Sequence, residues 1–103
     1  VMKKHQINQL SKMFAIINNA IQVYELNYSI YYELKTENEK SLIEQKLFKE
    51  NNNPLFNREF HDSLLEECGI LERDMHQTFT QISTMRTIRQ EMESQHKALT
   101  KEQ

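Results

Sequence analysis

The sequence predicts an all-α fold, a long antiparallel helical hairpin with coiled-coil-like packing, and three observations predict it. Glycine and proline occur once each in 103 residues, whereas β architectures need frequent tight turns. Apolar residues recur at helical spacing on both sides of the one clear break, residues 51–54. The arms on either side of the break, residues 3–50 and 54–101, are nearly equal in length, so a turn between them lays one arm along the other.

The first arm carries a heptad repeat, which we call the seam. Two positions in each heptad are apolar over four consecutive heptads, a period typical of coiled coils. The members of the seam in this arm are Ile7, Leu10, Phe14, Ile17, Ile21, Tyr24, Tyr28 and Tyr31. This repeat predicts a helix over about residues 3–35.

A second apolar row, which we call the outer stripe, runs beside the seam along the same arm. Its members are Met13, Ile16, Ala20, Val23, Ile30 and Leu34. Seam and stripe together cover an arc of about 160° of the helix, and one antiparallel neighbour covers only the seam. At about 25 cal/mol per Å², leaving the stripe in water forfeits several kcal/mol, comparable to a small domain's stability. We therefore predict that the stripe is a partner interface, which a second copy of the chain or a helix of another protein covers to complete a helical bundle by oligomerisation.

The seam lapses between Lys35 and Ser41, which leaves two architectures open. If the first helix continues, it reaches residue 50. The stretch "TENE" can instead start a new helix, with Thr36 as its cap and Glu39 three residues later. Residues 41–50 then fold back as a short middle helix, and the alternative fold is a three-helix bundle.

The stretch "NNNP" predicts a turn over residues 51–54, because Asn tolerates turn conformations. Pro54 suits the first position of the next helix, with Asn53 as its cap. Apolar spacing then predicts a second helix over about residues 55–101. Gly69 interrupts the composition of this helix but not its spacing, and a helix end at Gly69, with Ile70 packed on Leu65, is the alternative. The spacing is set by Phe60, Leu64, Cys68, Leu71, Met75, Phe79, Ile82, Met85, Ile88, Met92 and Leu99.

Folding the arms antiparallel about Asn53 brings the two repeats into phase, because it pairs positions whose numbers sum to 106. Ile7 then meets Leu99, and Ile21 meets Met85. Polar residues enter the seam nearer the turn, so we expect the third of the hairpin next to the turn to pack most loosely. The polar members there are Lys35 opposite Leu71, Asn38 opposite Cys68, and Gln45 opposite His61.

No residue pattern indicates catalysis, a cofactor or a metal. No two of the four histidines lie three or four residues apart, and the one Glu-x-x-His spacing, Glu93 with His96, lacks the second such motif that di-iron bundles use. Cys68 lies on the seam, where a cysteine usually acts as a small buried apolar residue. The chain has no glycine-rich phosphate loop and no nucleophile turn. We therefore predict that the protein is not an enzyme and binds no cofactor or metal.

The charge pattern bears on partners and on location. Residues 25–74 carry a net charge of −6, whereas the two ends together carry +4. In a hairpin the bases of the ends gather away from the turn, where we expect weak contact with acidic surfaces, while the overall acidity disfavours nucleic acid. This basic end comprises Lys3, Lys4, Lys12, Arg86, Arg89, Lys97 and Lys101. No apolar run approaches the ~18 residues of a transmembrane helix, and a single cysteine favours an intracellular, cytoplasmic or nuclear, setting.

These observations predict a single helical domain, residues 1–103, with a non-catalytic role in protein–protein interaction. The first hypothesis is an assembly module, a subunit or domain of a larger helical complex. The alternative is a monomeric three-helix regulatory bundle that binds a partner helix, as membrane-trafficking regulators do. Because the chain begins at Val1 rather than Met, we expect a piece of a longer chain or a processed end.

Overall fold

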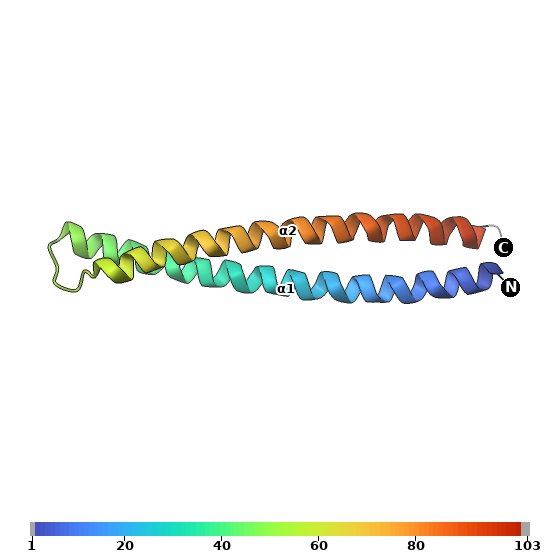
Figure 1. Ribbon diagram of the computed structural model, residues 1–103, viewed down its shortest axis with the longest axis horizontal. Helices are drawn as coiled ribbons and strands as arrows, with labels where there is room; N and C mark the ends of the chain where they lie inside the picture. The colour runs from blue at the N-terminus through green and yellow to red at the C-terminus, as the bar shows by residue number, and fades with distance from the viewer. Residues whose placement is uncertain (1, 102–103) are drawn as a thin grey trace. The chain divides into compact units, whose positions relative to one another are not determined.

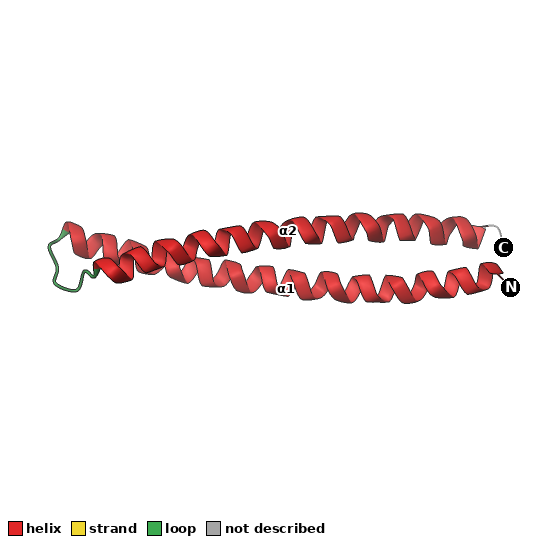
Figure 2. Cartoon of the chain, in the orientation of Figure 1, coloured by secondary structure: helices red, strands yellow, loops and turns green. Residues whose placement is uncertain are grey.

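Two long helices form the protein in the computed structural model, which describes the backbone of residues 2–101 and the side chains of residues 3–101. Helix α1 spans Met2–Glu50 and helix α2 spans Arg58–Lys101. The helices run antiparallel, joined by residues 51–57, and no strand occurs among the described residues (Figures 1 and 2). The predicted all-α helical hairpin is therefore confirmed. Val1, Glu102 and Gln103 of the expected domain lie outside the described residues.

Helix α1 is continuous through residues 35–41, where the sequence left a break open. The Thr36 hydroxyl donates to the Tyr32 carbonyl at 2.9 Å, as threonines inside helices do, instead of capping a new helix. Residues 41–50 therefore extend α1 and do not fold back. This continuity contradicts the three-helix alternative, because the described chain contains no third helix.

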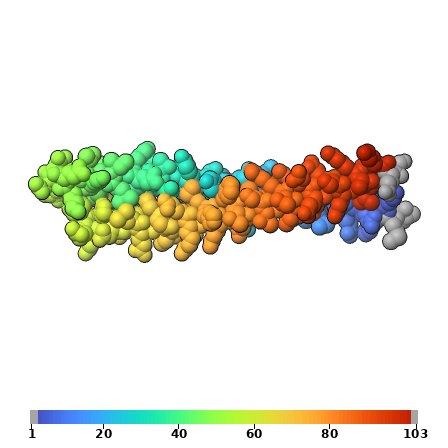
Figure 3. Space-filling model, turned by 90° about the horizontal axis from the view of Figure 1, so that it is seen from above, coloured from blue at the N-terminus to red at the C-terminus, as the bar shows by residue number. Residues whose placement is uncertain are grey.

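The chain divides into two compact units, each an antiparallel pair of helical segments. The first unit comprises Val1–Leu26 and Thr78–Gln103, and the second comprises Asn27–Gln77 with the connecting turn. In the first unit, the amino-terminal part of α1 (blue) lies against the carboxy-terminal part of α2 (red), as the space-filling view shows (Figure 3). Each unit has its own core along the seam.

The core of the first unit follows the heptad of α1. Ile21 is buried with 2% of its surface exposed, and Ile82 and Met92 of α2 are buried as well. The other predicted α1 seam residues of this unit, such as Phe14 and Ile17, are half-buried. The predicted seam of α1 is therefore confirmed in this unit.

The seam of α2 differs from the predicted one at three residues. Phe60, Phe79 and Ile88 were expected on the seam but are exposed, Phe79 by 57%. Buried Thr78 takes the seam position that was expected for Phe79. Half-buried Arg89 takes the seam position that was expected for Ile88. The reason is phase: a strict seven-residue repeat sets which face turns inward, and these three apolar side chains each lie one residue off that repeat.

The second unit has a more polar core. Leu64, Cys68 and Leu71 of α2 are buried, but Gln45 of α1 is buried with them. The Nδ2 atom of Asn38 is buried and has no hydrogen-bond partner. Polar seam residues expected from the sequence therefore do lie in the seam of this unit.

Asparagine residues form the turn that ends α1. Asn52 adopts a left-handed conformation with φ 51°, the Asn53 amide donates to the Phe48 carbonyl at 2.8 Å, and the Asn52 amide donates to the Lys49 carbonyl at 3.2 Å. These bonds are those of a Schellman motif, which satisfies the last carbonyls of α1. Asparagine replaces the usual glycine at its left-handed position.

Helix α2 begins at Arg58 rather than near residue 55, and its cap is Asn57 rather than Asn53. The Asn53 side chain accepts a bond from the Leu55 amide at 2.9 Å and so caps only a short turn. Asn57 accepts from the Phe60 amide at 3.0 Å, the capping contact of the long helix. The buried Gln45 Oε1 accepts from the Asn57 amide at 2.9 Å, and this long-range contact, invisible in local sequence, fixes the later start.

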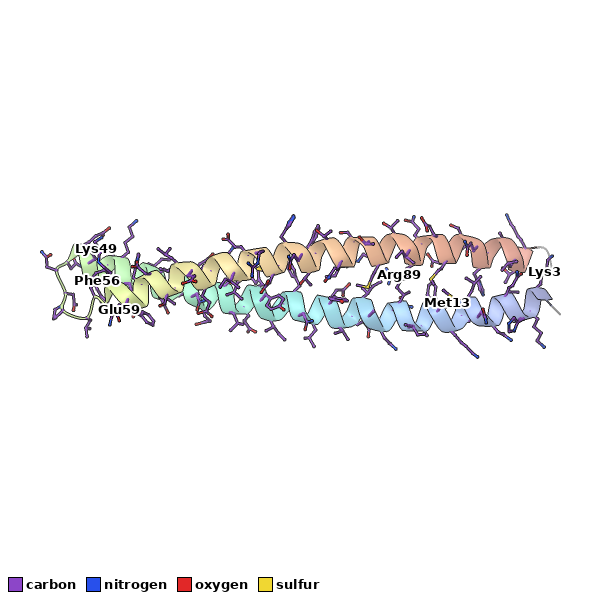
Figure 4. The ribbon with its side chains drawn as sticks, in the orientation of Figure 1. Lys3, Met13, Lys49, Phe56, Glu59 and Arg89 are labelled. Carbon is purple, nitrogen blue, oxygen red and sulfur yellow. The ribbon has the colours of Figure 1, made fainter. Side chains whose placement is uncertain are left out.

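An aromatic contact also ties the turn to α1. The Lys49 ammonium lies 5.9 Å from the centre of the Phe56 ring (Figure 4), within the range of a cation–π interaction. The Phe56 ring in turn lies 6.1 Å from the His61 ring. The connecting segment is therefore held to both helices.

Candidate functional site

The outer stripe of α1 is the main exposed apolar feature predicted from the sequence. In the first unit, Ile16 and Val23 expose 69% and 57% of their surface, Met13 is exposed, and Ala20 is half-buried. In the second unit, Ile30 and Leu34 are exposed as well. Neither unit provides a segment that covers these side chains. The contrast with Ile21, an isoleucine buried on the same helix, marks the boundary between seam and stripe.

A residue of α2 extends the apolar surface of the first unit. Met13 of α1 and Gln95 of α2 line the same open groove, whose volume is about 440 Å³. Because both helices repeat every seven residues, Ala20 and Ile88 lie on that same side one heptad farther along. Ile88 is exposed. The sequence analysis placed Ile88 on the seam and therefore did not predict its exposure. Its position seven residues before the polar residue Gln95 could have indicated that it lies off the seam.

Polar pairs close the opposite side of the seam in the first unit. The Arg86 guanidinium lies 2.8 Å from the Glu25 carboxylate, and Arg89 donates to the Asn18 side chain at 3.0 Å. Glu25 and Asn18 each follow a seam residue of α1, whereas the stripe residues Met13 and Ala20 each precede one. The two sides of the hairpin are therefore chemically different, one polar and one apolar.

The second unit shows the same kind of cross-helix pair. The Lys35 ammonium lies 3.3 Å from Glu72 on α2 and 3.5 Å from Glu39 on α1. The hydrogen bond to Glu72 is the main reason that the pKa of Lys35 is raised. Lys35 therefore enters the seam as a charged side chain that stretches to carboxylates at its edge.

The predicted basic end is smaller as a binding surface than the sequence suggests. Two of its seven members, Arg86 and Arg89, bind Glu25 and Asn18 within the first unit. Figure 4 labels Arg89 on α2 and Met13 on α1. A groove of about 390 Å³ at this end is lined by Leu10, Phe14 and Met92 together with the polar residues Ser11, Glu93, His96 and Lys97. The charges along this groove are mixed rather than uniformly basic.

The nucleophile and metal-ligand candidates are dispersed. Burial, followed by the nearby charges of Glu39 and Glu72, raises the pKa of the Cys68 thiol, so the thiol is neutral at physiological pH. His61 Nδ1 lies 3.1 Å from its sequence neighbour Asp62. Among residues 2–101, no three His, Cys, Asp or Glu side chains gather where they could hold a metal ion.

Neither helix within the described part of the chain has an apolar stretch that could cross a lipid bilayer. Comparisons of the chain with protein-family models, with curated proteins and with solved structures find no match.

Proposed function

We propose that this protein is a non-catalytic assembly module whose outer stripe packs against a helix of another protein subunit. One observation carries the proposal: Ile16 and Val23 are exposed on the same helix and within the same unit in which Ile21 is buried. Scattered apolar side chains are normal on protein surfaces, but a row at helical spacing is the pattern of a helix–helix interface.

The exposure of the stripe supports the same proposal, because its large side chains expose between 45% and 69% of their surface. Full burial of a Val, Leu, Ile or Met side chain stabilises by about 1.5–3 kcal/mol. The stripe residues are about half exposed, so covering each contributes on the order of 1 kcal/mol.

These contributions have to exceed the cost of association. Loss of translational and rotational freedom on binding costs roughly 4–15 kcal/mol. The stripe and Ile88 on one subunit, together with a matching apolar surface on the partner, supply an amount within this range. The expected association is therefore of moderate strength, which suits a module that acts together with other contacts in a complex.

Site-specific photo-cross-linking tests whether the stripe is covered. A photo-reactive amino acid replaces Val23 in one variant and Gln22 in the other. Both side chains are exposed, but neighbouring residues point about 100° apart around a helix. We expect irradiation to yield protein adducts from position 23 and far fewer from position 22. Equal yields at both positions, or none, would show that the stripe faces solvent.

A further inference from the structure

We propose that the partner of the outer stripe is a second copy of this chain, with the two α1 helices packed antiparallel. The inference rests on the proposed function and names the subunit that covers the stripe.

The stripe is self-complementary in its apolar residues. Val23 lies midway between Ile16 and Ile30 along α1, and all three are exposed. When two copies of α1 run antiparallel through Val23, Ile16 of one copy meets Ile30 of the other. Both ends of the interface then carry the same isoleucine contact, as an isologous two-fold interface requires.

The charges favour the antiparallel orientation over the parallel one. The residues of the second unit carry a net charge of −5, and the rest of the chain carries +3. Lys12 lies four residues before Ile16 and Glu33 lies three residues after Ile30, so these two charged residues flank the apolar row of α1. Antiparallel packing places Lys12 near Glu33 of the other copy. Parallel packing places Lys12 near Lys12 and Glu33 near Glu33, and such like-charge contacts disfavour a complex.

The surface available is large enough for a dimer. A standard stable interface buries about 800 Å² on each partner. The apolar row from Met13 to Leu34 extends roughly 32 Å along α1, at about 1.5 Å per residue. Ile88 of α2 lies on the same side as the stripe and widens the surface that a second α1 helix can cover.

Cysteine cross-linking of the full chain tests both the partner and the orientation. The background variant is Cys68→Ala, which removes the native thiol. Three single variants, Gln9→Cys, Val23→Cys and Glu37→Cys, place a thiol on the same side of α1, since these positions differ by multiples of seven. A short bismaleimide is the cross-linker, Gln22→Cys is the control off the stripe, and circular dichroism checks that each variant is helical.

The antiparallel dimer predicts that Val23→Cys links to itself, because it lies at the two-fold axis. Gln9→Cys and Glu37→Cys each fail to link alone but link to each other when the two variants are mixed. Linking of every single variant to itself, without linking in the mixture, would overturn the antiparallel orientation. No linking above the Gln22→Cys control, together with photo-adducts at position 23 of a different mass, would overturn the second copy as partner and leave the assembly function standing. Absence of both kinds of adduct would overturn the function itself.

Discussion

Asn38 places a side-chain amide inside the second unit, and its Nδ2 atom is buried without a hydrogen-bond partner. A buried donor without a partner costs about 1–3 kcal/mol. We therefore expect Asn38→Leu to raise the free energy of unfolding by about that amount, because leucine restores an apolar seam residue. Urea denaturation measures the change. The exposed Asn8→Leu serves as control and should stay within about 0.5 kcal/mol of the wild type; a destabilised Asn38→Leu would mean that the amide is satisfied.

Asn52 is the residue on which the turn geometry depends, because its φ of 51° is left-handed. A residue with a Cβ in that conformation is strained by roughly 1–2 kcal/mol, and asparagine tolerates it better than most. Asn52→Ala should therefore lower the free energy of unfolding by about 1 kcal/mol. Asn52→Gly, which adopts positive φ without strain, should be near neutral. Thermal denaturation of the two variants gives the comparison, and equal stability of both would contradict the left-handed turn.

The places of some single residues could not be predicted from the sequence. Exposed Phe79 and Ile88 look like seam residues when apolar side chains are counted, because one-residue phase errors are hidden in a helix rich in apolar groups. The cap at Asn57 depends on Gln45, twelve residues away, and no local rule connects the two. The stripe residues, in contrast, were predictable, since their exposure follows from heptad spacing alone.

At the scale of the element, continuity of α1 separates the hairpin from the three-helix alternative. Had Thr36 capped a new helix, Glu37 would occupy its first position, where proline is favoured. In the continuous helix, Glu37→Pro removes an internal hydrogen bond and clashes with the preceding turn, at a cost of about 3 kcal/mol or more. We expect a corresponding loss of stability in urea denaturation, with Glu37→Ala close to the wild type. A stable Glu37→Pro variant would place a helix boundary at this point.

The heptad repeat of α1 made most of this helix predictable from the sequence, whereas no repeat specified the geometry of the turn. Four apolar heptads fix the seam from Ile7 to Tyr31. Past Lys35 the seam becomes polar, and local pattern no longer decides between a continuing helix and a new one. The structure shows cross-helix contacts that support continuation, such as Lys35 with Glu72. Such contacts join residues of different helices, so the sequence of α1 alone does not predict them.

At the scale of the whole molecule, the two sides of the hairpin are expected to have different roles. On one side, Arg86 and Glu25 form an ion pair between the two helices, and such an exposed pair contributes little to stability. The side with Ile16 and Val23 stays apolar and exposed. A second copy of the chain is expected to cover the apolar side, and removing that side's hydrophobicity should abolish association without unfolding the monomer.

Sedimentation equilibrium of matched double variants tests this expectation most directly. Ile16→Glu with Val23→Glu places two carboxylates on the stripe. The control, Ala15→Glu with Gln22→Glu, adds the same charges at the same spacing, turned by one residue to an exposed polar face. We expect the wild type and the control to be dimeric and the stripe variant to be monomeric and helical. The dimer dissociation constant of the stripe variant should be raised by roughly 100-fold or more, since each factor of ten corresponds to about 1.4 kcal/mol. A wild type that sediments as a monomer while remaining fully helical would contradict burial of the stripe by a second copy.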